Sequence, residues 1–372
     1  MKVPFVDTQS QYQEIKQEVD NAVLDVLASG LYVSGKHVQL LEEEIASSCG
    51  VKHGVACNSG TDALKIGLQA MGLREGDEVI TTPFSFGATV EIIVQNGARP
   101  VFVDIDPKTF NMDVVHLKRA INERTRAIIP IHLFGQIADM EQIMKIANEH
   151  GLWVLEDAAQ SIGSTRNNKH AGSFGHAAGI SFYPTKNLGA AGDAGMIITN
   201  DDEIAERARA LRVHGMKTTY QYEWIGHTSR LDEIQAAILR IKLQRLNIWN
   251  EARNRHAKIY DEILSNAGAR TPFVAPETTY HNYHQYTIRH RQRDGLQRYL
   301  KDHGIATAIY YPSPLHLQPA YSFLGYMEGD FPETESACKE VLQLPVQQHL
   351  STEQIEYVAE TVVHFASTKA NV

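Results

Sequence analysis

The sequence has few cysteines, and they are not arranged as a framework. Its 372 residues contain three of them, Cys49, Cys57 and Cys338, and no two have CxxC spacing. An odd and sparse set argues against a network of disulfides and against a structural zinc site. Such cysteine usage is typical of a reducing compartment, so we expect a cytoplasmic protein.

Long hydrophobic runs and an excess of positive charge are also missing. Nowhere do about 18 apolar residues follow one another, and the segment from Met1 to Asp7 reaches an acid before any apolar stretch of signal-peptide length. We therefore expect no membrane partner. Lysine and arginine number 35 against 44 aspartates and glutamates, which gives a formal net charge of −9. That balance argues against nucleic acid as a partner, although a local basic pocket for a small phosphate compound stays open.

Between about residues 52 and 200, short apolar runs alternate with amphipathic stretches. The runs have the length and β-branched content of strands, and the stretches have helical spacing. This alternation predicts an α/β fold with a largely parallel sheet covered on both faces, in which ligands bind beyond the carboxyl ends of strands. The expected strands are 79–82, 100–103, 127–131 and 153–155, and the expected helices are 62–71, 113–123 and 140–150.

The pattern changes after about residue 200. A helix is expected over 202–212, and an apolar stripe over 231–246 predicts a long helix that bridges two domains. Strand-like alternation over 283–288 and helical spacing over 293–303 indicate a smaller α+β domain. We therefore predict a large domain within residues 1–249, which includes an N-terminal arm with helical spacing over 12–27, and a small C-terminal domain over 250–372.

Lys186 stands between an apolar, strand-like segment and a glycine-rich one, and Pro184 stiffens its approach. A lysine in such a place loses solvation, which lowers its pKa and exposes a neutral amine as a nucleophile. That is what a lysine requires to form a Schiff base. A lysine on the surface of a loop between a strand and a helix is the alternative interpretation.

Asp157 ends the buried-type run that begins at Trp153. A carboxylate at the carboxyl edge of a strand can pair with a protonated ring nitrogen of a cofactor and keep that ring cationic. Ala159, two residues further on, is small enough to let an aromatic ring lie flat. The alternative is that Asp157 is the N-cap of a helix.

Residues 56–64 are predicted to form a strand that turns through Gly60 into an amphipathic helix. Backbone N–H groups and the Thr61 hydroxyl at the start of that helix suit a phosphate, although a capped helix start without a ligand has the same pattern. Phe86 follows the strand at 79–82 and either stacks on a cofactor ring or belongs to the core.

These features follow one another in the order found in fold-type-I pyridoxal-phosphate enzymes: a phosphate-binding turn, a stacking aromatic, an acid at a strand end and a lysine. Over nearly its whole length the sequence resembles the DegT/StrS family of nucleotide-sugar aminotransferases. The segments that carry the resemblance are 4–7 (PFVD), 58–64 (NSGTDAL), 76–80 (GDEVI), 156–160 (EDAAQ), 181–189 (SFYPTKNLG), 229–232 (SRLD) with 235–237 (QAA), and 311–312 (YP) with 315–319 (LHLQP).

The resemblance implies a fold-type-I aminotransferase with a large, mostly parallel sheet of the seven-stranded type and a smaller α+β C-terminal domain. It implies pyridoxal 5′-phosphate as the cofactor, with pyridoxamine 5′-phosphate as its intermediate form, and a homodimer with shared active sites. Lys186 is similar to the Schiff-base lysine and proton carrier, and Asp157 to the partner of the ring nitrogen. The other implied contacts are Gly60, Thr61, Ser181 and Thr228 to the phosphate, Gln160 to the ring hydroxyl, Phe86 to the ring face, and Tyr183, Arg230, Tyr311 and His316 to the substrate.

Two positions depart from the family pattern. Thr228 stands where the family usually has asparagine, so the loop that crosses to the partner's site offers a shorter hydroxyl to the phosphate. Tyr310 replaces the histidine of a His-Tyr-Pro segment, which removes a titrating group from the expected sugar-nucleotide cleft. A related subgroup that performs dehydration has histidine in place of the lysine, and Lys186 argues against that chemistry.

The resemblance implies amino transfer from L-glutamate to a keto-sugar linked to a nucleoside diphosphate, in the biosynthesis of amino sugars. The segments from Tyr283 through Pro312 to Tyr321 are more similar to members that aminate C3 of a 3-keto-(deoxy)hexose. A 4-keto-sugar or cyclitol-ketone aminotransferase is the alternative, and a non-catalytic regulator on the same scaffold is the alternative from another class. The intact pair Lys186 and Asp157 favours an enzyme.

Histidines number 17 and raise the question of a metal site. His281 and His284 lie near the start of the strand-like segment, but no third ligand has a recognisable spacing, so no metal is predicted. His132, after the expected strand 127–131, is either a substrate contact or a histidine satisfied within a loop.

Overall fold

The central feature of the fold is a seven-stranded sheet, seen in the computed structural model, which describes residues 1–265 and 269–369. Its strand order is β1-β9-β8-β5-β4-β2-β3, and β5, β4, β2 and β3 are parallel neighbours, while β9 runs antiparallel to both β1 and β8. The expected mostly parallel sheet is therefore confirmed. The strands are β1 (His53–Cys57), β2 (Glu78–Thr81), β3 (Arg99–Phe102), β4 (Thr125–Ile128), β5 (Trp153–Asp157), β8 (Ala177–Ser181) and β9 (Gly195–Thr199).

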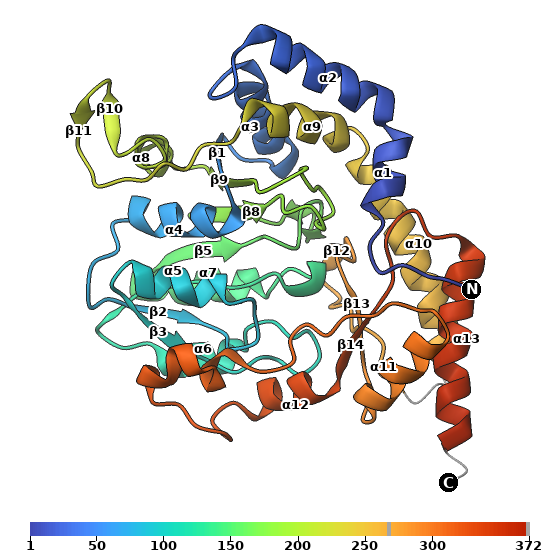
Figure 1. The fold of residues 1–372 in the computed structure, drawn as a ribbon. Helices are drawn as coiled ribbons and strands as arrows, with labels where there is room; N and C mark the ends of the chain where they lie inside the picture. Colours follow the sequence, from blue (N-terminus) through green and yellow to red (C-terminus); the bar gives the residue numbers. More distant parts are fainter. Residues whose placement is uncertain (266–268, 370–372) are drawn as a thin grey trace.

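Both faces of the sheet are covered, because successive residues of each strand point to opposite sides. Val55 and Ile197 pack into one hydrophobic cluster with α4, α5 and α8, whereas Ala56 and Ile198 pack on the other face with α3 and α9. Figure 1 shows this layered arrangement. The helices are α3 (Lys36–Cys49), α4 (Gly60–Ala70), α5 (Ala88–Gln95), α6 (Val114–Ala120), α7 (Met140–His150), α8 (Asp202–Leu211) and α9 (Glu233–Leu243).

The C-terminal part builds a separate hydrophobic cluster, in which Val3 from the N-terminus also takes part. A two-stranded sheet packs there against helices, and α10 and α13 lie side by side at one end of the molecule, close to the N-terminus (Figure 1). Position 250, the predicted domain boundary, lies within α10. The elements are α10 (Leu246–Leu264), β13 (Tyr286–Arg289), α11 (Arg293–Asp302), α12 (Pro332–Glu340), β14 (Val341–Leu344) and α13 (Thr352–Lys369).

Two expected helices are each broken into two. The apolar stripe over 231–246 is not one helix, because α9 ends at Leu243 and α10 begins at Leu246. The N-terminal stretch 12–27 is interrupted at Ile15, between α1 (Thr8–Glu14) and α2 (Lys16–Ser29). Ile15 is buried with Ile238 and Trp249, so packing of the arm against α9 and α10 accompanies the bend.

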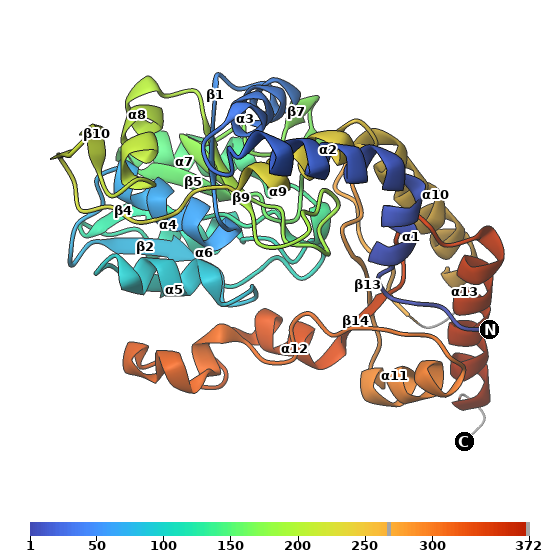
Figure 2. The ribbon, with the colours of Figure 1, turned by 45° about the horizontal axis from the view of Figure 1, so that its top comes forward.

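A short hairpin, β10 (Met216–Thr218) with β11 (Gln221–Tyr222), projects at the end of the molecule opposite α13 in both views (Figure 2). Several large apolar side chains near it are exposed, among them Ile225, which is 94% exposed. The remaining short elements are β6 (Thr165–Arg166), β7 (Lys169–His170), β12 (Thr278–Tyr280), η1 (Leu133–Gly135), η2 (Leu315–Leu317) and η3 (Pro319–Leu324).

Candidate active site

A cavity of about 460 Å³ opens where β5 and β8 end and α4 begins. Its volume lies within the range of pockets that bind small molecules and cofactors, about 300–1,000 Å³. The last residues of β5 and β8 line one side of the cavity, and residues 284–285 and 310–311 of the C-terminal part also line it. The predicted site residues that line it are Gly60, Thr61, Phe86, Asp157, Gln160, Ser181, Tyr183, Lys186 and Tyr311.

Lys186 lies at a bend in the loop that follows β8. Its backbone N–H donates to the carbonyl of Tyr183 (2.8 Å), and Phe182 is hydrogen-bonded to Ala190 and Ala194 on either side of the glycine-rich segment. This turn presents the lysine side chain to the cavity. Burial lowers the pKa of Lys186 to about 8, and the nearby charge of Asp157 opposes that shift. Because the Lys186 side chain lines the cavity and is half-buried, the surface-lysine alternative is wrong for this position.

Asp157 ends β5 and is 7% exposed. One carboxylate oxygen accepts a hydrogen bond from the hydroxyl of Thr89 (2.8 Å), and the other accepts from the N–H of Ala159 (3.2 Å). Residues 158–163 form turns and no helix, so the N-cap alternative is wrong. Thr89, in the first turn of α5, was missed in the sequence, because nothing in the spacing connects it with a strand end 68 positions away.

The N-terminus of α4 lies against the end of β8. Ser59 is the N-cap, and its hydroxyl accepts from the N–H of Asp62 (3.1 Å). A Cβ atom at Gly60 would lie 2.6 Å from Cβ of Ser181, so only glycine permits this close approach. The first N–H groups of a helix have no partner within it, so those of Gly60 and Thr61 are available to an anion.

Aromatic and amide side chains form the walls of the cavity. Phe86 is 64% exposed although it lines the cavity, so the alternative that it belongs to the core is wrong. The side-chain oxygen of Gln160 accepts from the N–H of Phe134 (2.8 Å), and its amide nitrogen donates to the Tyr311 hydroxyl (3.3 Å). Burial raises the pKa of Tyr311, and the charge of Asp157 adds to that shift, so its hydroxyl stays protonated.

Three predicted site residues are not among those that line the cavity in this chain. Thr228 is exposed, and its hydroxyl lies 2.7 Å from Nε2 of His214. Arg230, two residues further on, is half-buried. His316 is 2% exposed, and its Nε2 lies 3.2 Å from a carboxylate oxygen of Glu335.

His132 is held within the protein and is not among the residues that line the cavity. Its Nε2 lies 2.7 Å from the buried Glu156, and its Nδ1 accepts from the N–H of Ala138 (3.2 Å). Of the two interpretations of His132, the satisfied histidine is the correct one.

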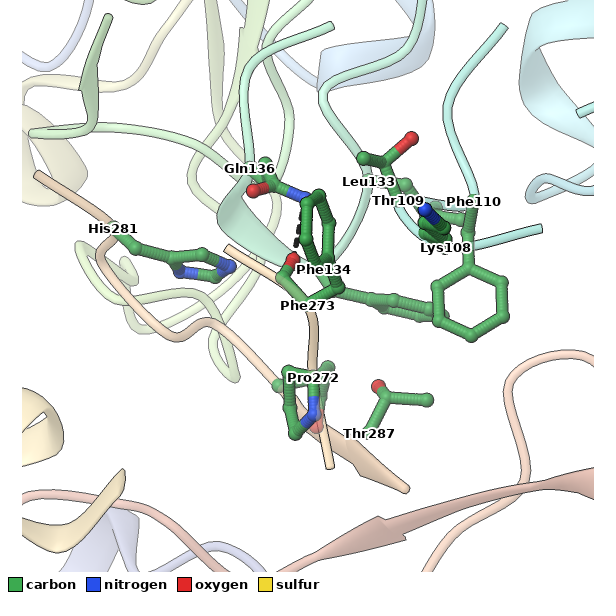
Figure 3. A pocket seen from close by; sticks show the side chains of 11 residues that line it. Lys108, Thr109, Phe110, Leu133, Phe134, Gln136, Pro272, Phe273, His281 and Thr287 are labelled. Carbon is green, nitrogen blue, oxygen red and sulfur yellow. Dashed lines mark hydrogen bonds between the residues drawn. The ribbon is translucent and has the colours of Figure 1, made fainter. Parts of the chain in front are cut away.

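A second pocket, of about 20 Å³, is lined by residues of the segment 133–136 and by His281, Pro272 and Phe273 (Figure 3). The amide of Gln136 donates to the carbonyl of Phe273 (3.0 Å) across it, shown as a dashed line. Gln285 lines both this pocket and the large cavity. A space of this size holds about one water molecule, so it offers no second site for an organic ligand.

Within residues 1–265 and 269–369, no cluster of three or more histidine, cysteine or acidic side chains is arranged to hold a metal ion. None of the helices in the described part of the chain has the length and apolar character needed to cross a membrane.

The fold and the cavity define a pyridoxal-phosphate-dependent aminotransferase of fold type I. The family model for the DegT/DnrJ/EryC1/StrS aminotransferase family matches residues 13–363, and the chain belongs to this family. Among solved structures, DesV of S. venezuelae in complex with a ketimine intermediate superimposes with a TM-score of 0.96 at 40% identity, covering 98% of both chains. NtdA of Bacillus subtilis with bound pyridoxamine phosphate has a TM-score of 0.92 at 31% identity, over 98% of this chain and 85% of that one.

Two curated relatives cover almost the whole chain. A protein of Geobacillus stearothermophilus named pleiotropic regulatory protein is 51% identical over 367 residues, 98% of this chain and 99% of the relative. The UDP-N-acetyl-3-dehydro-alpha-D-glucosamine 3-aminotransferase of Acidithiobacillus ferrooxidans is 42% identical over 360 residues, 97% of each. The comparisons confirm the expected family, fold, cofactor and enzyme class.

Proposed function

We propose that this enzyme transfers an amino group from L-glutamate to C3 of a nucleotide-linked 3-keto-hexose in the cytoplasmic biosynthesis of an amino sugar. The observation that carries the proposal is the placement of Lys186 and Asp157 on the walls of one cavity. A relative that is 42% identical and named for 3-amination supports the choice of C3. The buried, unpaired cysteines accord with a reducing compartment.

The residues of the cavity fit pyridoxal phosphate. Gly60 and Thr61 at the N-terminus of α4 are proposed to hold its phosphate, with Ser181 beside them at the end of β8. Phe86 offers a ring face at the cavity wall, and the amide nitrogen of Gln160 points into the same space toward the Tyr311 hydroxyl. These donors, an aromatic face and an acid are the groups that a phosphorylated, cationic pyridine ring needs.

The chain's own residues then have separate tasks. Bound pyridoxal phosphate supplies an electron sink for the carbon that loses and gains a proton. Asp157, held by Thr89 and by the N–H of Ala159, would pair its carboxyl group with the protonated ring nitrogen. Lys186, whose pKa is lowered to about 8, accepts and returns a proton as a neutral amine.

The lowered pKa of Lys186 predicts a pH dependence of cofactor capture. Only the neutral amine is a nucleophile, and at pH 7 a pKa of about 8 leaves roughly 300 times more of it than an ordinary lysine would have. The rate at which the cofactor-free chain captures pyridoxal phosphate should therefore rise with pH and level off above about 8. Absorbance measurements of cofactor capture check this. The reference is the amino acid lysine with its α-amino group blocked, so that only its side-chain amine reacts. A rate that keeps rising to about pH 10.5, as for the reference, would contradict the shift.

A substitution at Gly195, the first residue of β9, tests whether the start of α4 binds the phosphate. A Cβ atom there would lie 2.2 Å from the carbonyl oxygen of Ser59 and 2.6 Å from the nitrogen of Gly60, so alanine must displace the start of α4. We expect Gly195→Ala to weaken binding of pyridoxamine phosphate, which forms no bond to Lys186, by about 10- to 100-fold. Gly192→Ala is the matched control, because its Cβ meets only the end of the Gln235 side chain, at 3.2 Å. Equal affinity of the two variants would count against the assigned phosphate site.

We further propose a homodimer in which the segment before Ser229 reaches the partner's site. The exposed apolar residues of α2 and of the hairpin, such as Leu24, Leu27 and Tyr222, support a covered surface there. Thr228 and Arg230 would then act in the partner's cavity, which accounts for their position away from their own. A substrate contact of His316 stays a prediction.

The reaction is tested by its product. The chain loaded with pyridoxamine phosphate is mixed with a panel of nucleotide keto-sugars, and the amino sugar is identified by mass spectrometry and NMR. A 3-amino product is expected, together with bleaching of the cofactor's absorbance band when L-glutamate is added to the pyridoxal form. If only a 4-amino product formed, the position of amination would be C4 and the proposal of C3 would be wrong. A chain that binds no cofactor and instead shifts a DNA band would favour a regulator, the activity named for one relative.

A further inference from the structure

A cluster of buried asparagines joins the lysine loop to two distant parts of the chain. Asn187, directly after Lys186, donates through its side chain to Oδ1 of Asn250 on α10 (2.7 Å) and to the backbone carbonyl of Asn282 (3.1 Å). All three asparagines are buried, at 3% exposure or less. Each buried polar group in such a cluster needs a hydrogen-bond partner. Each side-chain amide can therefore take only one of its two orientations.

Backbone carbonyls, which can only accept, determine how each amide is turned. Asn250 donates through Nδ2 to the carbonyl of Ile162 (3.3 Å), so its Oδ1 faces Asn187. Asn187 must then present Nδ2 to Asn250 and to the carbonyl of Asn282, which leaves its Oδ1 as an acceptor. Turning either amide around would place acceptor against acceptor and leave a buried N–H without its partner.

That acceptor determines the tautomer of His284. Oδ1 of Asn187 lies 3.0 Å from Nδ1 of His284, so Nδ1 carries the proton and Nε2 of the neutral ring carries a lone pair. Burial lowers the pKa of His284 far below its ordinary value, and the charges of Lys186 and Arg253 add to that shift. The amide nitrogen of Gln285 lies 3.4 Å from Nε2, beyond the range of about 2.7–3.2 Å typical of a strong bond.

His284 and Lys186 line the same cavity. We propose that His284 is a positioning residue whose Nε2 accepts a hydrogen bond from the Lys186 amine in a rotamer of the free lysine side chain other than the one in the structure. The hydrogen bonds from Asn250 through Asn187 to His284 then fix the position that the Lys186 amine takes when it is not bonded to the cofactor. A lysine head group on a flexible stem benefits from such an acceptor, because even a half-buried ammonium without a partner loses part of its solvation. The inference rests on the proposed role of Lys186.

Two substitutions separate the two nitrogen atoms of His284. Asparagine at this position keeps an N–H near the place of Nδ1, within reach of Asn187, but has no atom at the place of Nε2. Glutamine reaches the place of Nε2 with its carbonyl oxygen and gives up the contact with Asn187. In the full-length chain freed of cofactor, the rate of pyridoxal phosphate capture is measured against pH, and its midpoint reports the pKa of Lys186. Thermal unfolding of each variant is followed in parallel.

An ammonium donates a stronger hydrogen bond than a neutral amine, so loss of the acceptor lowers the pKa of Lys186. We expect the midpoint of His284→Asn to fall by about one pH unit, and that of His284→Gln to stay within roughly 0.3 units of the wild type. An unchanged midpoint in His284→Asn, or equal shifts in both variants, would overturn the proposal. A wild-type chain that captures no pyridoxal phosphate would instead overturn the role of Lys186 itself.

The tautomer can also be observed directly in the wild-type protein, with a variant used only to assign the signal. In wild-type protein with nitrogen-15 in its histidines, the ring nitrogens that carry protons are identified by NMR, and His284 is assigned by the signal that His284→Gln lacks. We expect the proton on Nδ1 and a lone pair on Nε2. A proton on Nε2 would overturn the proposal, because that nitrogen could no longer accept from Lys186.

Discussion

Replacement of Lys186 by methionine is expected to abolish amino transfer and to leave the fold intact. Methionine keeps most of the apolar stem but removes the amine that is proposed to attack the cofactor and to carry the proton. The loss of a general base and nucleophile together should lower kcat by about 10³-fold or more. The measurement is the rate at which L-glutamate bleaches the cofactor's absorbance, compared between wild type and Lys186→Met.

The same substitution should stabilise the cofactor-free protein at neutral pH. The pKa of Lys186 is about 8 in the folded chain, below its value of about 10.4 when unfolded, so folding disfavours the charged form. That cost is fully present below about pH 8 and disappears as the pH rises past the unfolded value. Since the side chain is only partly buried, Lys186→Met should gain about 2 kcal/mol in the free energy of unfolding at pH 7 and little at high pH.

A matched control separates the site from the residue type. Lys145 is exposed on α7 and is not among the residues that line the cavity. Lys145→Met therefore removes the same charge without touching the site, and both its turnover and its stability should remain close to those of the wild type. Turnover by Lys186→Met at a comparable rate would mean that another group is the nucleophile.

The large sheet domain was predictable because its parallel strands are buried on both faces and are therefore short, continuous apolar runs. The expected strands at 79–82 and 100–103 each differ from the observed β2 and β3 by one position at either end. The expected helix at 140–150 has the bounds of α7, whose end is marked by Gly151 in the left-handed conformation (φ 64°). Such signals involve only neighbouring residues, so they can be recognised from the sequence alone.

The breaks in the long helices were not predictable from periodicity. The apolar spacing continues through Gln244 and Arg245, where α9 gives way to α10, because both helices keep an apolar face toward the core. Ile15 is likewise apolar and has no helix-breaking side chain. Its side chain packs in one buried cluster with Trp249, more than 200 residues away, and no local pattern contains that contact.

The site was predictable in its main groups and not in its supporting contacts. Asp157 ends one strand and Lys186 comes after another, and parallel strands end at the same edge of a sheet, so the sequence suffices to bring them together. Whether Phe86 faces the core or the cavity depends on the path of a loop, and composition could not decide it. The contact between Asn187 and His284 joins positions 97 apart through a turn and an irregular segment, so no spacing rule connects them.

Glu156 illustrates how much of the site depends on such supporting contacts. It is fully buried beside Asp157, and its carboxylate accepts from the N–H groups of Gly172 (2.9 Å), Phe174 (2.7 Å) and Gly175 (2.6 Å). It also lies 2.7 Å from Nε2 of His132, which must be the donor because Nδ1 of that ring already accepts a backbone N–H. The carboxylate therefore ties the end of β5 to the segment 172–175.

Glu156→Ala should lower the free energy of unfolding by about 3–5 kcal/mol, because three backbone N–H groups and an imidazole N–H are left buried without an acceptor. Glu156→Gln should lose less, since its amide oxygen still serves two of them. Urea unfolding followed by circular dichroism gives the values, and Glu149→Ala, at an exposed position of α7, is the control. Cofactor affinity should fall together with stability, because Asp157 is the next residue of the same strand. A loss below about 1 kcal/mol in Glu156→Ala would show that water replaces the carboxylate and that the strand end is held by other contacts.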